Sequence, residues 1–264
     1  MFDYHMHSSF SGDCNIDMEE MVKGAIRQGL TEICFTDHVD YDYPDDSIVF
    51  DFDKKLYASR IQQLREKYEG QIRIKKGVEI GVQPHILQQC GEMVKEEGFD
   101  FVICSLHTVA RKGLHYGELF EGRSVDEASA IYYEELLHCV KHFDSYSLLG
   151  HIDLIKRYAK EKASSDFHDV LRQIFEVIIP AGKGIELNTS GVRYGLDCGL
   201  PSEDVLKLYK QCGGEIITLG SDAHKPEDIA FQFKESADLL RSIGFRYLTT
   251  FEQMKPQFHS IDQL

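Results

Sequence analysis

The chain begins with FDYHMH (residues 2–7), a short apolar segment that carries two histidines. In an extended strand successive side chains point to opposite faces, so His5 and His7 are expected to share one face, with Met6 on the other. Two neighbouring imidazoles at a strand end form the beginning of a metal site. One His-x-His pair also arises by chance, so the interpretation depends on what the rest of the chain supplies.

Further along the chain, other short apolar runs end in the same way, with His, Asp or Glu. These runs end in Thr36-Asp37-His38, Gly77-Val78-Glu79, Ser105-Leu106-His107, Gly150-His151-Ile152-Asp153 and Ser221-Asp222-Ala223-His224. Each residue alone has an ordinary structural role available, such as capping a helix, but one placement rule shared by all of them indicates a common site. Nitrogen and oxygen ligands without thiolate suit zinc, manganese or iron. Because the ligands are too many for one ion, we expect two or three divalent metals.

Strand candidates alternate with helix candidates along the whole chain, in seven strand–helix units without a linker or repeat. This pattern predicts one domain over residues 1–264, built on a parallel sheet that is covered by helices. Either an open doubly wound sheet or a closed barrel fits the pattern. Only a closed barrel brings ligands from six strand ends to one mouth. We therefore predict an α/β fold of the distorted seven-stranded (β/α) barrel type, followed by a last short extended piece at 245–250.

Composition narrows the classes of function. The formal net charge of −15 argues against nucleic-acid backbones and anionic membranes as partners. The seven cysteines are scattered, which predicts reduced thiols. The sequence shows neither an 18-residue apolar run nor a leader segment, so we expect a cytoplasmic protein. A small substrate in a local pocket remains compatible with this charge, because bound metals would invert the local field.

The histidine-rich motifs at the strand ends are similar to those of the polymerase-and-histidinol-phosphatase (PHP) superfamily. Length and motif order resemble its stand-alone histidinol-phosphatase branch over nearly the whole chain. The resemblance implies a trinuclear site in which Glu79 bridges the first two metals. The implied ligands are His5, His7, Glu79 and Asp222 for the first metal, Glu79, His107 and His151 for the second, and Asp13, His38 and His224 for the third.

Two details of this implied site are particular to the chain. Position 13 is histidine in some relatives and aspartate here, which keeps an oxygen ligand. Asp37, beside His38, is expected to orient an imidazole without binding metal itself.

Arg157 and Arg193 each follow a predicted barrel strand. Near a metal cluster a guanidinium would give a phosphate monoester two parallel hydrogen bonds, and the resemblance places phosphate-binding arginines in these two segments. His115 is the third expected substrate contact, because it lies in the long loop 108–123.

The resemblance implies a metal-dependent phosphatase that hydrolyses L-histidinol phosphate by attack of a metal-bridging hydroxide, with Asp222, Glu79 and His224 as catalytic residues. Several alternatives stay open. They are a phosphatase for another small phosphomonoester or for phosphotyrosine, a nuclease, which the negative charge disfavours, and a metal-binding module without catalysis.

Overall fold

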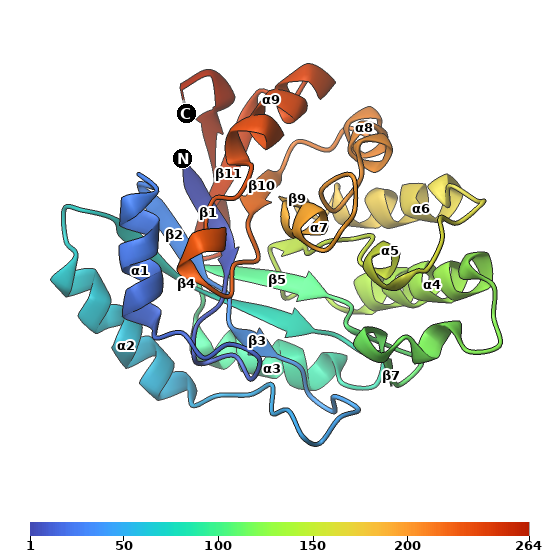
Figure 1. The fold of residues 1–264 in the computed structure, drawn as a ribbon, viewed down its shortest axis with the longest axis horizontal. Coiled ribbons are helices and arrows are strands. Elements are labelled where there is room, and N and C mark those ends of the chain that lie inside the picture. Colours follow the sequence, from blue (N-terminus) through green and yellow to red (C-terminus); the bar gives the residue numbers. More distant parts are fainter. Residues whose placement is uncertain (264) are drawn as a thin grey trace.

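Within residues 1–263, which the computed structural model describes, seven parallel strands wind around one axis in sequence order (Figure 1). The strands are β1 (Phe2–Met6), β2 (Glu32–Phe35), β4 (Arg73–Gly81), β5 (Phe101–Ser105), β8 (Leu148–Leu149), β9 (Gly184–Asn188) and β10 (Ile217–Gly220). A bridge between Met6 and Ala223 places the end of the last strand beside the first. The predicted seven-stranded barrel is therefore confirmed, in a nearly closed form.

A short break in the sheet distorts the barrel beside His38 and Glu79, two of the predicted metal ligands. After β2 the chain leaves the sheet for two residues and returns as β3 (His38–Val39), which pairs with the upper half of β4. The register then sets His38 directly beside Glu79. A second irregularity is a bulge in β1 between Asp3 and Met6. Bulges redirect side chains, and here Tyr4 joins an apolar cluster while His5 joins a polar one.

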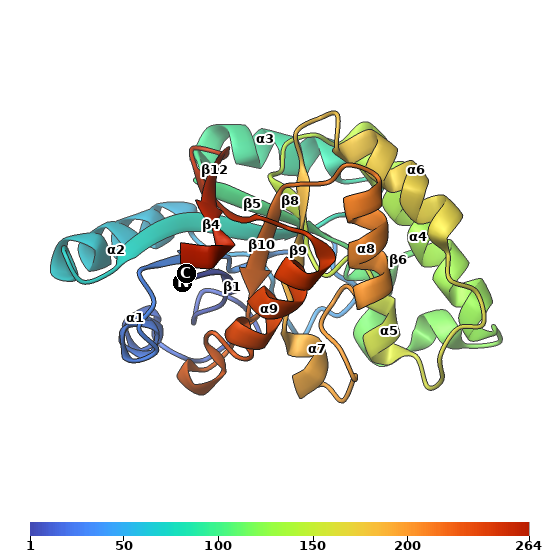
Figure 2. The same ribbon diagram turned by 90° about the horizontal axis from the view of Figure 1, so that it is seen from above.

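The helices lie on the outside of the barrel (Figures 1 and 2). They are α1 (Met18–Arg27), α2 (Lys54–Lys67), α3 (Leu87–Glu97), α4 (Val125–His142), α5 (Ile155–Tyr158), α6 (His168–Ile178), α7 (Ser190–Arg193), α8 (Glu203–Gln211) and α9 (Phe233–Ile243). Their starts follow local capping chemistry: Asp17 accepts from the Glu19 amide at 2.8 Å, and Ser124 forms a capping box with Glu127. None of the helices in residues 1–263 is both long and apolar enough to cross a membrane.

The remaining elements are short and belong to the connections. They are the hairpin of β6 (Thr108–Val109) and β7 (Lys112–Gly113), and the 3₁₀ turns η1 (Leu114–Tyr116), η2 (Glu118–Phe120), η3 (Pro226–Asp228) and η4 (Ile261–Gln263). The loop 108–123, expected as a substrate element, is therefore partly ordered by local structure.

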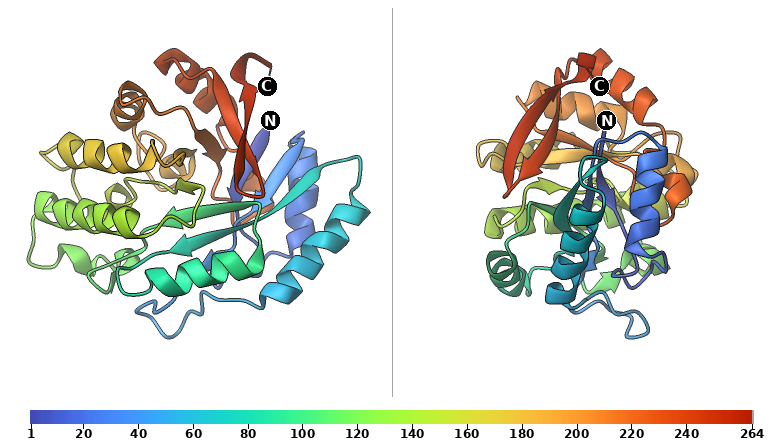
Figure 3. Two further views of the ribbon diagram at one scale, coloured as in Figure 1. Left: turned by 180° about the vertical axis from the view of Figure 1, so that it is seen from behind. Right: turned by 90° about the vertical axis from the view of Figure 1, so that its left-hand side faces the viewer.

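A C-terminal hairpin lies at the N-terminal end of the barrel, beside the start of β1 (Figure 3). It consists of β11 (Tyr247–Glu252) and β12 (Lys255–Ser260), so the expected extended piece at 245–250 is confirmed and continues into a second strand. The ring of Phe251 lies 5.0 Å from that of Phe101 and 6.5 Å from that of Tyr4, and the Tyr4 hydroxyl donates to the Phe251 carbonyl at 3.2 Å. These aromatic side chains fill the base of the barrel, so the polar site lies at the opposite end.

Candidate metal centre

Every predicted ligand lies at or just beyond the carboxyl end of a barrel strand, or in the loop that follows one, and the structure brings all of them together. The cluster is built around Glu79 in β4, which is fully buried. Five imidazoles approach its two carboxylate oxygens. Oε2 lies 2.9, 3.2 and 3.5 Å from nitrogens of His5, His38 and His7, and Oε1 lies 2.9 and 3.2 Å from Nε2 of His151 and His107.

Within residues 1–263 the converging ligand atoms follow the division implied by the resemblance only in part. His5, His7 and Asp222 converge as implied, but Glu79 converges with His5 and His151 on one side and with His38 and His107 on the other. On the Oε2 side of Glu79, Nε2 of His7 and Nε2 of His5 lie 3.3 and 3.8 Å from Asp222 Oδ1. On the Oε1 side are His107 and His151. Ligands on a tetrahedral zinc with bonds of ~2.1 Å stand roughly 3.4 Å apart, so the separations of 2.9–3.8 Å around Glu79 and Asp222 are those of a metal shell. Glu79 is placed to bridge them.

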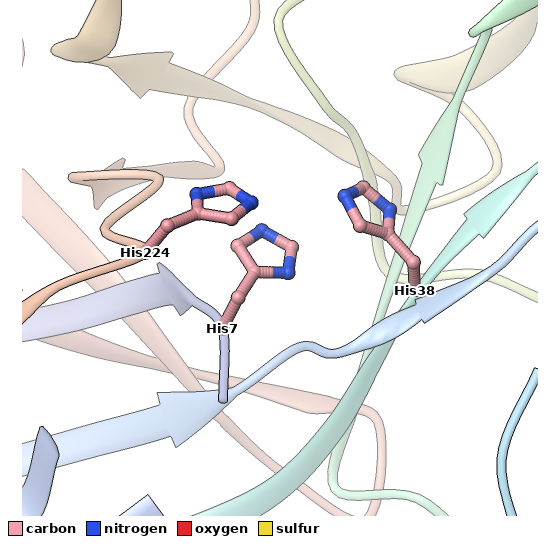
Figure 4. Close-up of side chains that lie close together, drawn as sticks. All are labelled: His7, His38 and His224. Carbon is pink, nitrogen blue, oxygen red and sulfur yellow. The ribbon is translucent and has the colours of Figure 1, made fainter. Parts of the chain in front are cut away.

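The third group lies closer to solvent. Asp13 Oδ2 is 3.3 Å from His224 Nε2 and 3.7 Å from His38 Nε2, and the Asp13 side chain is 36% exposed. The His7 ring lies between those of His38 and His224, with centroid distances of 4.4 and 4.2 Å (Figure 4). The three imidazoles come from the ends of different strands and converge on one small volume.

Two imidazole nitrogens in the cluster show that these residues fit a bound cation. His7 Nε2 and His38 Nδ1 are buried, and neither makes a hydrogen bond within the part of the chain that is described. A buried polar nitrogen without a partner is costly and rare. Both nitrogens face carboxylate oxygens at 3.2–3.5 Å, so a metal ion between them would satisfy nitrogen and carboxylate together.

Two buried carboxylates that the sequence analysis did not identify stand behind the cluster. Glu186 in β9 lies 2.9 Å from Nδ1 of His5, and Asp40 lies 2.6 Å from Nδ1 of His107. A signal for Glu186 was available, because a charged side chain inside the apolar run 184–187 must find a buried partner.

Asp37 does not have the predicted contact. Its carboxylate accepts hydrogen bonds from Ser8 and Ser11 rather than from an imidazole. The Ser11 hydroxyl lies 3.1 Å from Nδ1 of His7, so Asp37 reaches an imidazole only through this serine. The physical reason is that its position between β2 and β3 turns the carboxylate toward the loop after β1.

Opposing charges set the protonation of the cluster. Burial alone would lower the pKa of His5, but the surrounding carboxylates, with Glu186 and Glu79 the strongest, raise it well above its usual value. Burial would also lower the pKa of His107, but Asp40 and Glu79 together raise it well above its usual value. Although burial would raise the pKa of Glu79, the neighbouring imidazoles hold it well below its usual range, so this carboxylate is ionised.

His7 and His224 differ in protonation although their rings are stacked. Burial and the neighbouring imidazoles of His224 and His38 lower the pKa of His7 to about 3, which keeps this imidazole neutral and its nitrogen lone pair free. Burial would also lower the pKa of His224, but Asp13 and Asp222 raise it to about 9. A cation bound in the third group would therefore displace a proton.

The predicted substrate contacts lie on the same side of the barrel as the ligands. The Arg157 guanidinium reaches Ser190 and, at 3.3 Å, Asp222 Oδ2, and it stacks on the Tyr194 ring at 4.1 Å. Its Nε is buried without a partner within residues 1–263. His115 on η1 is exposed, and its ring lies 6.2 Å from that of Tyr158, the residue after Arg157.

Arg193 on α7 is more fully engaged than Arg157. It donates to the backbone carbonyls of Ser221 (2.8 Å) and Asp222 (2.9 Å), and its Nε lies 3.4 Å from Asp228. Three of the guanidinium's five N–H groups therefore have protein partners.

Comparison with known proteins places the chain in a family. A sequence profile described as the PHP domain matches residues 3–190. The chain belongs to the PHP family. Among PHP proteins, a histidinol-phosphatase of Lactococcus lactis is 31% identical over 260 residues, which cover 96% of this chain and 95% of that protein. A histidinol-phosphatase of Bacillus subtilis is 24% identical over 259 residues, 88% and 96% of the two chains.

A solved PHP structure has the same architecture. It is the histidinol phosphate phosphatase of Lactococcus lactis, complexed with zinc, L-histidinol and phosphate. The two chains superpose with a TM-score of 0.88 at 30% identity, over 97% of this chain and 98% of the other. The barrel and its order of strands are thus those of a PHP enzyme.

Proposed function

We propose that this chain is a metal-dependent phosphoric monoester hydrolase that converts L-histidinol phosphate to L-histidinol and inorganic phosphate. One observation carries the proposal. A buried carboxylate, Glu79, stands between two groups of ligands with metal-shell spacing, and the Arg157 guanidinium lies against Asp222 at their edge. The similarity to histidinol-phosphatases over nearly the full chain supports this choice of substrate.

We assign the residues as follows. His5, His7, Glu79 and Asp222 hold a first divalent metal, Glu79, His107 and His151 a second, and Asp13, His38 and His224 a third. We propose zinc, manganese or iron for these positions, because the donor set is nitrogen and oxygen without thiolate. When bound, such metals acidify water and neutralise the charge of a phosphoryl group.

The chain's own residues supply the remaining steps. Arg157 and Arg193 orient the phosphate monoester. Arg157 offers its Nε, which has no partner among the described residues, and Arg193 offers the N–H groups beyond the three that are engaged. Asp222 is the proposed acceptor of the proton from the attacking water, and His224, whose Nδ1 lies 3.7 Å from Asp222 Oδ1, stands beside it at the junction of the first and third groups. His115 and Tyr158, whose rings lie 6.2 Å apart, are the proposed contacts of the alcohol part of the substrate.

Three further assignments belong to the same proposal. The chain acts as one domain over residues 1–264, it acts in the cytoplasm, and its partner is a small phosphomonoester rather than nucleic acid or membrane. The net charge of −15 supports the last assignment, because a phosphate backbone would be repelled.

A phosphate-release assay tests the proposed function. Purified protein is supplied with zinc, manganese or iron(II) and given L-histidinol phosphate, phosphotyrosine, and several sugar and amino-alcohol phosphates, while cleavage of single-stranded DNA is followed separately by gel electrophoresis. The proposal expects the highest kcat/KM on L-histidinol phosphate. Faster turnover of another monoester would keep the phosphatase and replace the substrate, whereas no hydrolysis with any metal would leave a binding module.

A further inference from the structure

Asp40 and Glu186 are buried carboxylates that touch the metal centre without belonging to it. Each faces the Nδ1 of an imidazole whose Nε2 points at Glu79, so the imidazole ring stands between the carboxylate and the ligand cluster. Their relative exposures are 7% and 1%, so both charges are withdrawn from water. An ionised carboxylate in such a place is costly unless its oxygens are satisfied.

Glu186 is satisfied by the back of the first ligand group. Its oxygens lie 2.9 and 3.1 Å from Nδ1 of His5, whose Nε2 faces Glu79. Oε1 also accepts from the His151 backbone amide at 2.7 Å and from the Asn188 side chain at 3.0 Å. The carboxylate is thus fixed from three directions, and the His5 ring is fixed by it.

Asp40 has the same relation to the second ligand group. Its Oδ2 lies 2.6 Å from Nδ1 of His107, whose Nε2 faces Glu79. Its other oxygen accepts from the Gly81 amide at 3.0 Å, and the Asp40 amide donates to the Phe50 carbonyl at 2.9 Å. Both the backbone and the side chain of Asp40 are therefore held.

Glycines leave the space that these two carboxylates occupy. A Cβ on Gly81 would lie 2.2 Å from the Asp40 carboxyl. A Cβ on Gly220 would lie 2.5 Å from the Cβ of His5 and 2.6 Å from Glu186 Oε2. Any other residue at either position would disturb the contact between the carboxylate and its histidine. The sites are built to hold a carboxylate behind an imidazole.

We propose that Glu186 and Asp40 are positioning residues, which fix the ring orientation and tautomer of His5 and His107 and so set the affinity of two different metal positions. In each pair the imidazole Nδ1–H donates a hydrogen bond to the carboxylate, which leaves the Nε2 lone pair directed at a cation. This inference rests on the proposed metal assignments, in which His5 binds the first metal and His107 the second.

Metal affinity measured by chelator competition tests the inference. Glu186→Gln and Asp40→Asn keep the size of the side chain and remove its charge. Each variant should weaken one metal equivalent about 10- to 100-fold, the usual effect of losing such a partner, and leave the others near wild type. With cobalt(II) in place of the native metals, the two variants should change different bands of the visible spectrum, because different metals are affected.

Glu32→Gln is the matched control. Glu32 is also a buried carboxylate, but it binds Tyr4 and Arg73 near the base of the barrel. It should bind metal like the wild type. The inference is overturned if Glu186→Gln and Asp40→Asn retain wild-type affinity for every metal, or if all three variants lose metal alike.

A measurement on the wild-type protein covers the case in which a variant does not fold. Imidazole ¹H–¹⁵N correlation spectra of the zinc-loaded protein should show His5 and His107 protonated at Nδ1 and metal-bound at Nε2. The opposite tautomer at either ring would overturn the inference. None of these readouts depends on turnover, so a protein that binds metals but leaves histidinol phosphate intact would refute the proposed function alone.

Discussion

Arg193 donates a hydrogen bond to the backbone carbonyl of Asp222, 2.9 Å away, and a second to the carbonyl of Ser221 just before it. Asp222 has a φ of 54°, in the left-handed region that residues other than glycine seldom adopt. Its amide donates to the His5 carbonyl at 2.7 Å. The backbone that aims the Asp222 carboxylate at the first ligand group is thus held on both sides.

Because Arg193 holds the backbone of Asp222, Arg193→Lys should affect metal binding in addition to phosphate binding. The single ammonium group of a lysine cannot donate to both carbonyls as the planar guanidinium of Arg193 does. Because these contacts hold the backbone of Asp222, the variant should lose metal from the first group as well as activity. We expect kcat/KM for histidinol phosphate to fall by about 10- to 150-fold or more, from the loss of at least one charged hydrogen bond. Elemental analysis beside the assay decides the cause: full metal content would mean that Arg193 serves the substrate alone.

Arg157→Lys should behave differently. Arg157 contacts side chains and the Tyr194 ring rather than the backbone that carries Asp222. Its loss as a phosphate anchor should lower kcat/KM by about 10- to 150-fold with metal content unchanged. Arg111→Lys, on a side chain that is 70% exposed, is the control and should be neutral. Normal turnover by Arg157→Lys would make this arginine a structural residue.

Glu79→Gln tests the bridge. The substitution keeps the shape of the side chain but removes the charge that two cations would share. We expect a folded protein with reduced metal content and activity lowered by at least ~100-fold. Circular dichroism, metal analysis and the phosphate assay on the same sample separate these effects, and near-normal turnover would contradict the bridging role.

The metal load itself can be counted. Three ligand groups surround Glu79, Asp222 and Asp13, so protein purified without chelator should contain two to three transition metals per chain. Elemental analysis gives the number. Fully active protein with one metal or fewer would rule out the trinuclear assignment.

Removing the metals should reverse the dependence of stability on pH. In the metal-free protein His224 has a pKa of about 9 against a usual value of 6.5, and other carboxylates raise the pKa of His5 (Glu186 and Glu79) and of His107 (Asp40 and Glu79). The stability from a protonated His224 is fully present below about pH 6.5 and is lost as the pH rises through about 9. Chelated protein should therefore melt at a lower temperature at pH 9 than at pH 6.5.

With metals bound, the same change in pH should act in the other direction, because ligation requires neutral imidazoles and releases their protons. Calorimetry in buffers of different ionisation enthalpy should detect protons released on zinc binding at pH 7. Zinc binding without proton release would contradict the raised pKa values of His5, His107 and His224.

The sequence was sufficient for the barrel and the ligand cluster, because both follow from a repeated local pattern. An apolar strand that ends in His, Asp or Glu places its last side chain at one mouth, whichever strand it is. Asp40 and Glu186 escaped detection because their significance lies in imidazole nitrogens more than 60 residues away in sequence. The contacts of Arg193 could not be predicted from the sequence either. They are made to backbone carbonyls, which every residue type carries.

The second strand of the C-terminal hairpin was missed for a different reason. The turn at Gln253 and Met254 has φ values of 49° and 61°, a two-residue form normally indicated by Asn-Gly or a similar pair. Neither residue gives that signal. The strand that follows, Lys255–Ser260, is largely exposed and lacks a clear apolar alternation.

The aromatic side chains at the base of the barrel, Tyr4, Phe101 and Phe251, leave the reaction site with one entrance. Phe251 and its neighbours close that end, so substrate, water and both products must pass through the ligand-lined mouth. In the proposed reaction the residues around Glu79 would hold metals that bind the phosphate, so the phosphate would lie deepest and the alcohol would lie between it and solvent. The alcohol must then depart first, and inorganic phosphate, as the last product to leave, should compete with the incoming substrate.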